Sequence, residues 1–120
     1  MPAPHPTEIK LHQKSQLVEI SYPDGKSFRL PSEFLRVFSP SAEVRGHGPG
    51  QEVLQVGKKN VQIVAVEPVG NYAIQLRFSD GHDTGIYSWD LLYDYGERQQ
   101  AMWQQYLKRI ADAGACREDK

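Results

Sequence analysis

The chain has 120 residues, 39% of them apolar and 24% charged, a composition typical of one globular domain that can bury a core of its own. Its 14 basic and 15 acidic residues give a net charge of −1, so no charge excess indicates nucleic acid or an anionic membrane as a partner. Cys116 is the only cysteine, which excludes an internal disulfide and a metal site built from several cysteines, and favours a reducing, cytoplasmic location.

Residues 1–6 predict a disordered N-terminal arm. Prolines alternate with other residues there and favour extended, solvated backbone. The arm has neither the basic start nor the apolar stretch of a secretory signal. No apolar run in the sequence approaches the roughly 20 residues needed to cross a bilayer, so we expect no membrane association.

The first expected element is a set of strands joined by turns. Residues 7–13 and 17–22 have the alternation and the residue types of strands. Asp24 and Gly25 predict a tight turn, because glycine adopts the positive φ that such turns need. Residues 27–30 then return as a short strand.

A helix and a loop follow these strands. Pro31 and Ser32 are typical of a helix start, and the apolar residues up to Phe38 would form its buried stripe. The pattern then breaks over residues 39–51, where glycine and proline predict a loop.

A second group of strands is expected after this loop. Residues 52–56 and 61–67 have strand patterns, and residues 68–71 predict a turn. Residues 72–78 alternate strictly, which places Tyr72, Ile74, Leu76 and Phe78 on one face. Asp80-Gly81 predicts another turn, after which residues 84–87 return as a short strand.

The C-terminal part predicts helices. Ser88 is a good N-cap, and Gly96 is expected to interrupt the helix that it begins. A longer amphipathic helix should cover residues 97–113, with Trp103 and Tyr106 in its buried stripe. We expect residues 7–113 to form a single domain and residues 114–120 to be a frayed tail.

The sequence repeats one structural plan. Residues 22–26 and 78–82 each follow an alternating strand, turn at Asp-Gly, return briefly and enter a serine-led helix. The expected fold class is therefore α+β, an antiparallel-rich sheet built from two strand–turn–strand–helix units with a C-terminal amphipathic helix. The two units could share one sheet.

His82 is the most interesting ionisable residue, because it directly follows the second Asp-Gly turn. It could be a metal ligand with Asp80 or Asp83, a general base, or a structural histidine bonded to one of these carboxylates. The structural role is favoured, since no other ligand lies nearby in the sequence. The pair His82-Asp83 lacks the His-x-Asp spacing of iron oxygenases, and no nucleophile-elbow motif is present.

Arg45 and His47 form a second candidate surface within the glycine-rich loop. Backbone amides there could hold an anion, with charge from Arg45 and a hydrogen-bond donor from His47. The loop lacks both the P-loop ending and the dinucleotide-binding spacing, which favours a simple connector. Aromatic residues on the later strands could stack on bases, but Arg77 is the only basic residue interleaved with them, so no nucleic-acid partner is expected.

Two longer motifs carry a likeness to a known family. Residues 67–74 read Glu-Pro-Val-Gly-Asn-Tyr-Ala-Ile, and residues 78–89 read Phe-Ser-Asp-Gly-His-Asp-Thr-Gly-Ile-Tyr-Ser-Trp. With these motifs the chain resembles bacterial stand-alone members of the γ-butyrobetaine-hydroxylase-like N-terminal family, also called DUF971. Residues 22–25 and 34–38 also fit, and the likeness extends from about residue 7 to residue 92.

The resemblance implies where a metal site would lie. In the hydroxylase, such a domain holds zinc through three cysteines and a histidine and precedes a 2-oxoglutarate-dependent oxygenase core. The histidine corresponds to His82, and the cysteines correspond to Ser39, Ser41 and Val44. Serine is a poor zinc ligand and valine is none, so the site is degenerate and no cofactor is expected, with bound zinc or iron as the alternative.

The function expected from these observations is a non-catalytic interaction or adaptor domain whose partner is another protein. Related domains are fused to scaffold proteins of iron–sulfur assembly, so the resemblance suggests a role accessory to that process or to another metalloenzyme. Two alternatives stay open: a weak metal-binding protein that uses His82 with nearby carboxylates, and a small enzyme of unrecognised type. This sequence carries no oxygenase core, so the resemblance does not imply hydroxylase activity.

Overall fold

The first repeat unit forms a three-stranded antiparallel sheet followed by a short helix. The computed structural model describes residues 5–41, 44 and 54–117. Strands β1 (Glu8–His12), β2 (Leu17–Ser21) and β3 (Ser27–Pro31) pair in this order, and helix α1 (Ser32–Val37) follows directly. These elements confirm the strands and the helix expected for the first unit.

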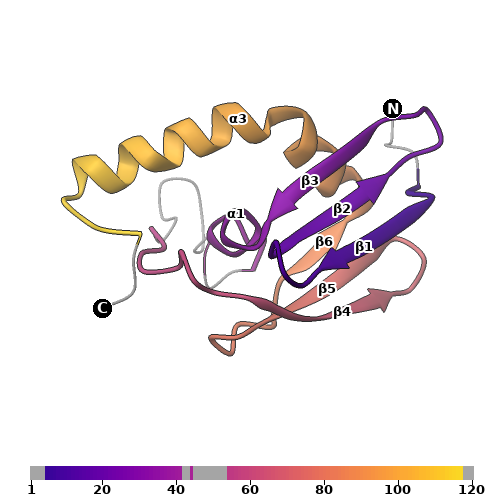
Figure 1. Cartoon of the computed structure of the whole chain (residues 1–120), viewed down its shortest axis with the longest axis horizontal. Helices are drawn as coiled ribbons and strands as arrows, with labels where there is room; N and C mark the ends of the chain where they lie inside the picture. Colours follow the sequence, from indigo (N-terminus) through magenta and orange to yellow (C-terminus); the bar gives the residue numbers. More distant parts are fainter. Residues whose placement is uncertain (1–4, 42–43, 45–53, 118–120) are drawn as a thin grey trace.

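The second repeat unit has the same plan. Strands β4 (Ile63–Val69), β5 (Ala73–Phe78) and β6 (Ile86–Ser88) form another antiparallel sheet, and helix α3 (Trp89–Asp112) follows. The α+β class is thus confirmed, although each unit forms a sheet of its own where the sequence suggested one shared sheet. Figure 1 shows α1 between the long helix α3 and the strands.

The two Asp-Gly turns, at residues 22–26 and 78–82, have the same hydrogen bonds. In each turn the amide of the first residue donates to the carbonyl of the fifth, at 2.9 and 3.0 Å. The amide of the fifth residue donates to the aspartate Oδ1, at 3.0 and 3.2 Å. Gly25 and Gly81 have φ values of 87° and 89°, a region that glycine adopts without steric cost. The repeat seen in the sequence is therefore a structural repeat.

The second unit differs from its predicted pattern in three places. Of the strand expected over residues 52–56, the described residues 54–56 are not a strand, and β4 begins only at Ile63. It also continues through Pro68, which is tolerated because β4 is an edge strand, where a missing amide proton need not cost a ladder bond. Tyr72 lies in the turn before β5 and is 55% exposed, so its expected place on the buried face is wrong.

Helix α3 is continuous, and its start confirms the predicted cap. The Ser88 Oγ accepts a hydrogen bond from the Leu91 amide at 3.1 Å. The expected interruption at Gly96 is wrong, because this residue lies inside the helix against the ring of Phe28. A Cβ at position 96 would lie 2.2 Å from that ring, so glycine is what allows β3 and α3 to pack closely. Trp103, which was expected in the core, is only half-buried.

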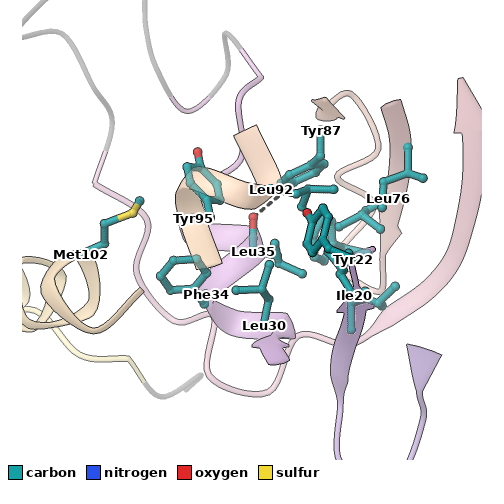
Figure 2. Close-up of a cluster of buried hydrophobic side chains, with 14 residues drawn as sticks. Ile20, Tyr22, Leu30, Phe34, Leu35, Leu76, Tyr87, Leu92, Tyr95 and Met102 are labelled. Atoms are coloured by element: carbon teal, nitrogen blue, oxygen red, sulfur yellow. Dashed lines mark hydrogen bonds between the residues drawn. The ribbon is translucent and has the colours of Figure 1, made fainter. Parts of the chain in front are cut away.

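The core lies between the two helices and the inner faces of both sheets, and its largest side chains come from all of these elements (Figure 2). Its fully buried residues include Ile20, Leu30, Leu35, Leu76, Tyr87 and Leu92. The Tyr87 hydroxyl donates to the Leu35 carbonyl oxygen at 2.5 Å, a bond that ties the second unit to α1 (Figure 2). Although α3 has 24 residues, neither it nor another helix in the described part of the chain is apolar enough to cross a membrane.

Candidate functional site

Helix α1 is the centre of the candidate site. All six of its residues are buried, including three polar ones. A buried polar group without a hydrogen bond is costly, so each of these side chains needs a partner from another part of the fold. The contacts are Ser32 with Gln16, Glu33 with Arg117, and Arg36 with Asp80.

The structure places His82 against the segment that follows α1. Its side chain is buried, and the imidazole Nε2 lies 2.8 Å from the Oγ of Ser39, which is 1% exposed. The Ser39 Oγ also accepts a hydrogen bond from the Ser41 amide at 3.3 Å. A Cβ on Gly85 would lie 2.5 Å from the same oxygen, so glycine at position 85 allows the two segments to meet.

A second hydrogen bond joins the same two segments. The Ser41 Oγ and the Thr84 Oγ1 lie 2.6 Å apart. Val44 is buried and, with Ser39, lines a small hollow of about 280 Å³. The two serines that the family resemblance relates to zinc ligands are thus held in hydrogen bonds, and Val44 is part of the buried apolar surface.

Asp80 is fixed by two cations. Its Oδ2 accepts hydrogen bonds from the Arg36 Nε and the Lys58 Nζ, both at 2.9 Å, while its Oδ1 caps the turn at the His82 amide. Burial alone would raise the pKa of Asp80, but the hydrogen bonds from Lys58, the His82 amide and Arg36 outweigh burial and lower it to about 2. Asp80 is therefore a carboxylate at neutral pH, with its charge already neutralised.

The remaining residues predicted from the sequence are Asp83, Arg45 and His47. Asp83 is exposed, and its backbone carbonyl accepts a hydrogen bond from the Gln75 side chain. Arg45 and His47 lie outside the described residues. Within the described residues, no three histidine, cysteine, aspartate or glutamate side chains are grouped so that they could hold a metal ion.

Sequence reasoning missed Arg36 and Lys58. Arg36 occupies a polar position in a six-residue helix, where periodicity alone indicates a solvent-facing charge. Its partner Asp80 lies 44 residues away in the chain. The only local signal was that apolar residues flank Arg36 on both sides.

A second polar cluster lies at the start of α1. The Glu33 carboxylate receives two hydrogen bonds from Arg117, at 2.8 and 2.7 Å, and the guanidinium carbon lies 5.2 Å from the centre of the Trp103 ring. These residues, with Phe34 and Gly96, line a hollow of about 650 Å³ beside α3. No motif predicted this cluster, since 84 residues separate its two charges.

Backbone hydrogen bonds position Arg117. After α3 the chain turns back beneath the helix (Figure 1). The Cys116 carbonyl accepts from the Gly57 amide at 3.0 Å, and the Arg117 carbonyl accepts from the Lys59 amide at 2.9 Å. These hydrogen bonds join residues 116 and 117 to residues 57 and 59, and residues 118–120 lie outside the described part of the chain.

Comparison with known proteins supports the family resemblance. The family model described as "Gamma-butyrobetaine hydroxylase-like, N-terminal" matches residues 9–93. Two proteins with NMR solution structures are 49% and 53% identical to this chain, each with a TM-score of 0.83. The matches cover 96% and 98% of this chain and 90% and 87% of those chains.

A crystal structure gives a third match. It shows a protein of unknown function from Acidithiobacillus ferrooxidans that belongs to the DUF971 family. The two chains are 42% identical with a TM-score of 0.62, and the match covers 73% of this chain and 88% of that one. The search among curated proteins gave no match.

Proposed function

The chain belongs to the γ-butyrobetaine hydroxylase-like N-terminal family, and we propose that it is a non-catalytic interaction domain that docks on another protein. The partner class that the family resemblance suggests is an iron–sulfur assembly protein or another metalloenzyme. We place the docking surface at one corner of the domain, defined by His82 with Asp80, Asp83 and Val44. It includes Arg45 and His47, which follow Val44 in the sequence.

The observation that carries this proposal is that the polar side chains around His82 already have partners within the fold. Ser39 and His82 are both buried and satisfy each other at 2.8 Å, and Asp80 is neutralised by Arg36 and Lys58. Hydrogen-bonded and ion-paired groups of this kind hold two chain segments together. Reactive groups used for catalysis need access to a substrate, so a function at the exposed surface fits this corner better.

The metal-binding alternative has less support from the geometry. His82 has its Nε2 directed at Ser39, and Asp80 would have to give up two cationic partners to become a ligand. Asp83 is exposed and could bind an ion only weakly by itself.

The enzyme alternative rests on the serine–histidine pair. A hydroxyl beside an imidazole is the arrangement of an activated nucleophile. Ser39 is 1% exposed, however, and substrate would reach its oxygen only if the packed segments separated. This burial favours a structural role for the pair.

Capture of the native partner tests the proposal. Tagged wild-type chain, R45A and H47A would be used to recover proteins from the native host, and each recovered protein would then be titrated as a purified component. We expect a saturable partner that both variants bind more weakly. Melting temperatures should stay unchanged, because the sequence predicts an exposed loop at these positions and substitutions in such a loop cost about 0.5 kcal/mol or less. Lys14→Ala, at an exposed turn residue, is the matched control and should bind as the wild type does.

Two results would contradict the proposal. Unchanged binding by both loop variants would remove this corner as the docking surface. A stoichiometric metal in untagged protein, with a large fall in melting temperature on chelation, would replace the interaction role by the metal-binding alternative.

A further inference from the structure

We infer that the Glu33 carboxylate and the Trp103 ring form a recognition site for an arginine side chain of a partner protein, and that Arg117 occupies this site from within the chain. The inference rests on the proposed interaction function and names a second surface with a defined partner chemistry. It lies at the start of α1, whereas the corner around His82 follows the end of that helix.

The carboxylate of Glu33 is built into the fold. Its side chain is 8% exposed, and both of its oxygens accept hydrogen bonds from Arg117. Two parallel bonds of 2.8 and 2.7 Å match the planar fork of a guanidinium, which a lysine ammonium cannot reproduce. A carboxylate buried to this degree requires a cation, because leaving it unpaired is strongly unfavourable.

The Trp103 ring completes the site. The guanidinium carbon lies 5.2 Å from the ring centre, within the range of a cation–π contact. Trp103 is half-buried, and its ring packs at 6.3 Å from that of Phe34 in α1. Both the acidic and the aromatic walls therefore belong to helices that pack against each other.

The present occupant is less firmly enclosed than its site. The Arg117 side chain is 34% exposed, compared with 8% for Glu33, so the guanidinium enters from the solvent side. Hollows of about 650 and 390 Å³ lie next to the ion pair, and both are lined by Pro31, Glu33 and Arg117. The Arg117 side chain thus lies at the boundary of both hollows.

The larger hollow can accommodate the chain around a partner's arginine. Its volume lies within the range of roughly 300–1,000 Å³ usual for ligand pockets. Gln99, Gln100 and Gln104 line it along α3, and their side-chain amides make no hydrogen bond to another residue in the described part of the chain. These amides are free to bond the backbone of an extended peptide on either side of the inserted arginine.

Because Arg117 occupies the site, it competes from within the chain with any external arginine. An intramolecular competitor has an effective concentration in the millimolar range, so an external arginine binds the wild-type chain more weakly than a chain whose site is vacant. Removing the Arg117 guanidinium should therefore create a measurable affinity for free arginine derivatives.

The test is to titrate N-acetyl-L-arginine amide into wild-type chain, R117K and R117A, following the Trp103 indole N–H resonance, which W103F identifies. We expect saturable shifts in R117A, weaker binding in R117K, and binding at least about tenfold weaker in the wild type than in R117A. The melting temperature of R117A should rise with the ligand. If R117A does not fold, the comparison of R117K with the wild type carries the same test.

Two controls define failure. N-acetyl-L-citrulline amide has the same shape without the charge, and the E33Q/R117A double variant lacks the carboxylate. The inference is overturned if R117A and R117K show no saturable shift, or if either control responds as strongly as the arginine derivative does in R117A. Such a result removes this site alone, since the partner-capture experiment separately decides whether the domain binds a protein.

Discussion

The Nε2 atom of His82 and the Oγ atom of Ser39 lie 2.8 Å apart, although 43 residues separate them in the chain. The bond joins the end of α1 to the second Asp-Gly turn. Both side chains are buried, and a hydrogen bond is stronger where water is excluded. The pair therefore links the two repeat units, whose sheets share no strand pairing within the described residues.

Ser39→Ala should destabilise the fold by about 1–3 kcal/mol, because it takes a hydrogen-bond partner from a buried imidazole. Urea denaturation of both proteins would measure the change in the free energy of unfolding. Ser15→Ala, at an exposed turn residue, is the matched control and should change it by about 0.5 kcal/mol or less. Equal stability of S39A and wild type would show that the bond contributes nothing.

Asp80→Asn should change how stability depends on pH. The unfolded chain protonates this carboxyl near its ordinary pKa of 3.8, whereas the folded chain does so near pH 2. The stabilisation by Asp80 is therefore complete above about pH 4 and is lost as the pH falls toward 2. The difference in unfolding free energy between wild type and D80N should shrink over that range, as urea titrations at successive pH values would measure.

Asparagine keeps the side-chain oxygen that caps the turn, so D80N tests the charge and spares the turn. Lys58→Met removes one of the two cations and leaves the carboxylate in place. It should flatten the same part of the pH profile to a smaller extent, because Arg36 remains. A constant difference between wild type and D80N from pH 7 to pH 2 would contradict the proposed role of the ion pairs.

The repeat units could be predicted from the sequence because their signals act over a few residues. Asp-Gly turns require only the positive φ of glycine, and the cap at Ser88 involves an amide three residues away. The prediction for Gly96 was wrong because its role depends on a residue far away in the sequence. Local propensity indicates a break there, whereas packing against Phe28, which is distant in sequence, favours glycine within the helix.

The candidate site was predictable only in part. His82 was identified by its place beyond a turn, and Ser39 and Ser41 by the likeness to a family motif. The partners of α1 were not predictable, because the Glu33–Arg117 contact spans 84 residues and no periodic pattern reports such a distance. Contacts of this kind follow from the packing of whole elements.

Gly96→Ala should destabilise the protein even though alanine favours helix formation by about 1 kcal/mol. The added methyl group would lie 2.2 Å from the Phe28 ring, and overpacking of this kind costs about 1–3 kcal/mol. In an F28A background the space is open, and the same substitution should become neutral or stabilising. Thermal or urea unfolding of the four proteins would give the coupling energy, and simple additivity would contradict the steric explanation.

The triple substitution S39C/S41C/V44C should create a zinc site with His82. The family resemblance places cysteines at these three positions, and a three-cysteine, one-histidine set is typical of structural zinc. The tips of residues 39 and 82 already lie 2.8 Å apart, close enough for one ion to contact both after a small adjustment. We expect one zinc ion per chain by metal analysis and a melting temperature that falls on chelation. Adding H82A to the triple variant should weaken zinc binding, and the wild type should bind none at stoichiometric levels. If the triple variant binds no zinc, the correspondence between these positions and the family's ligands is wrong.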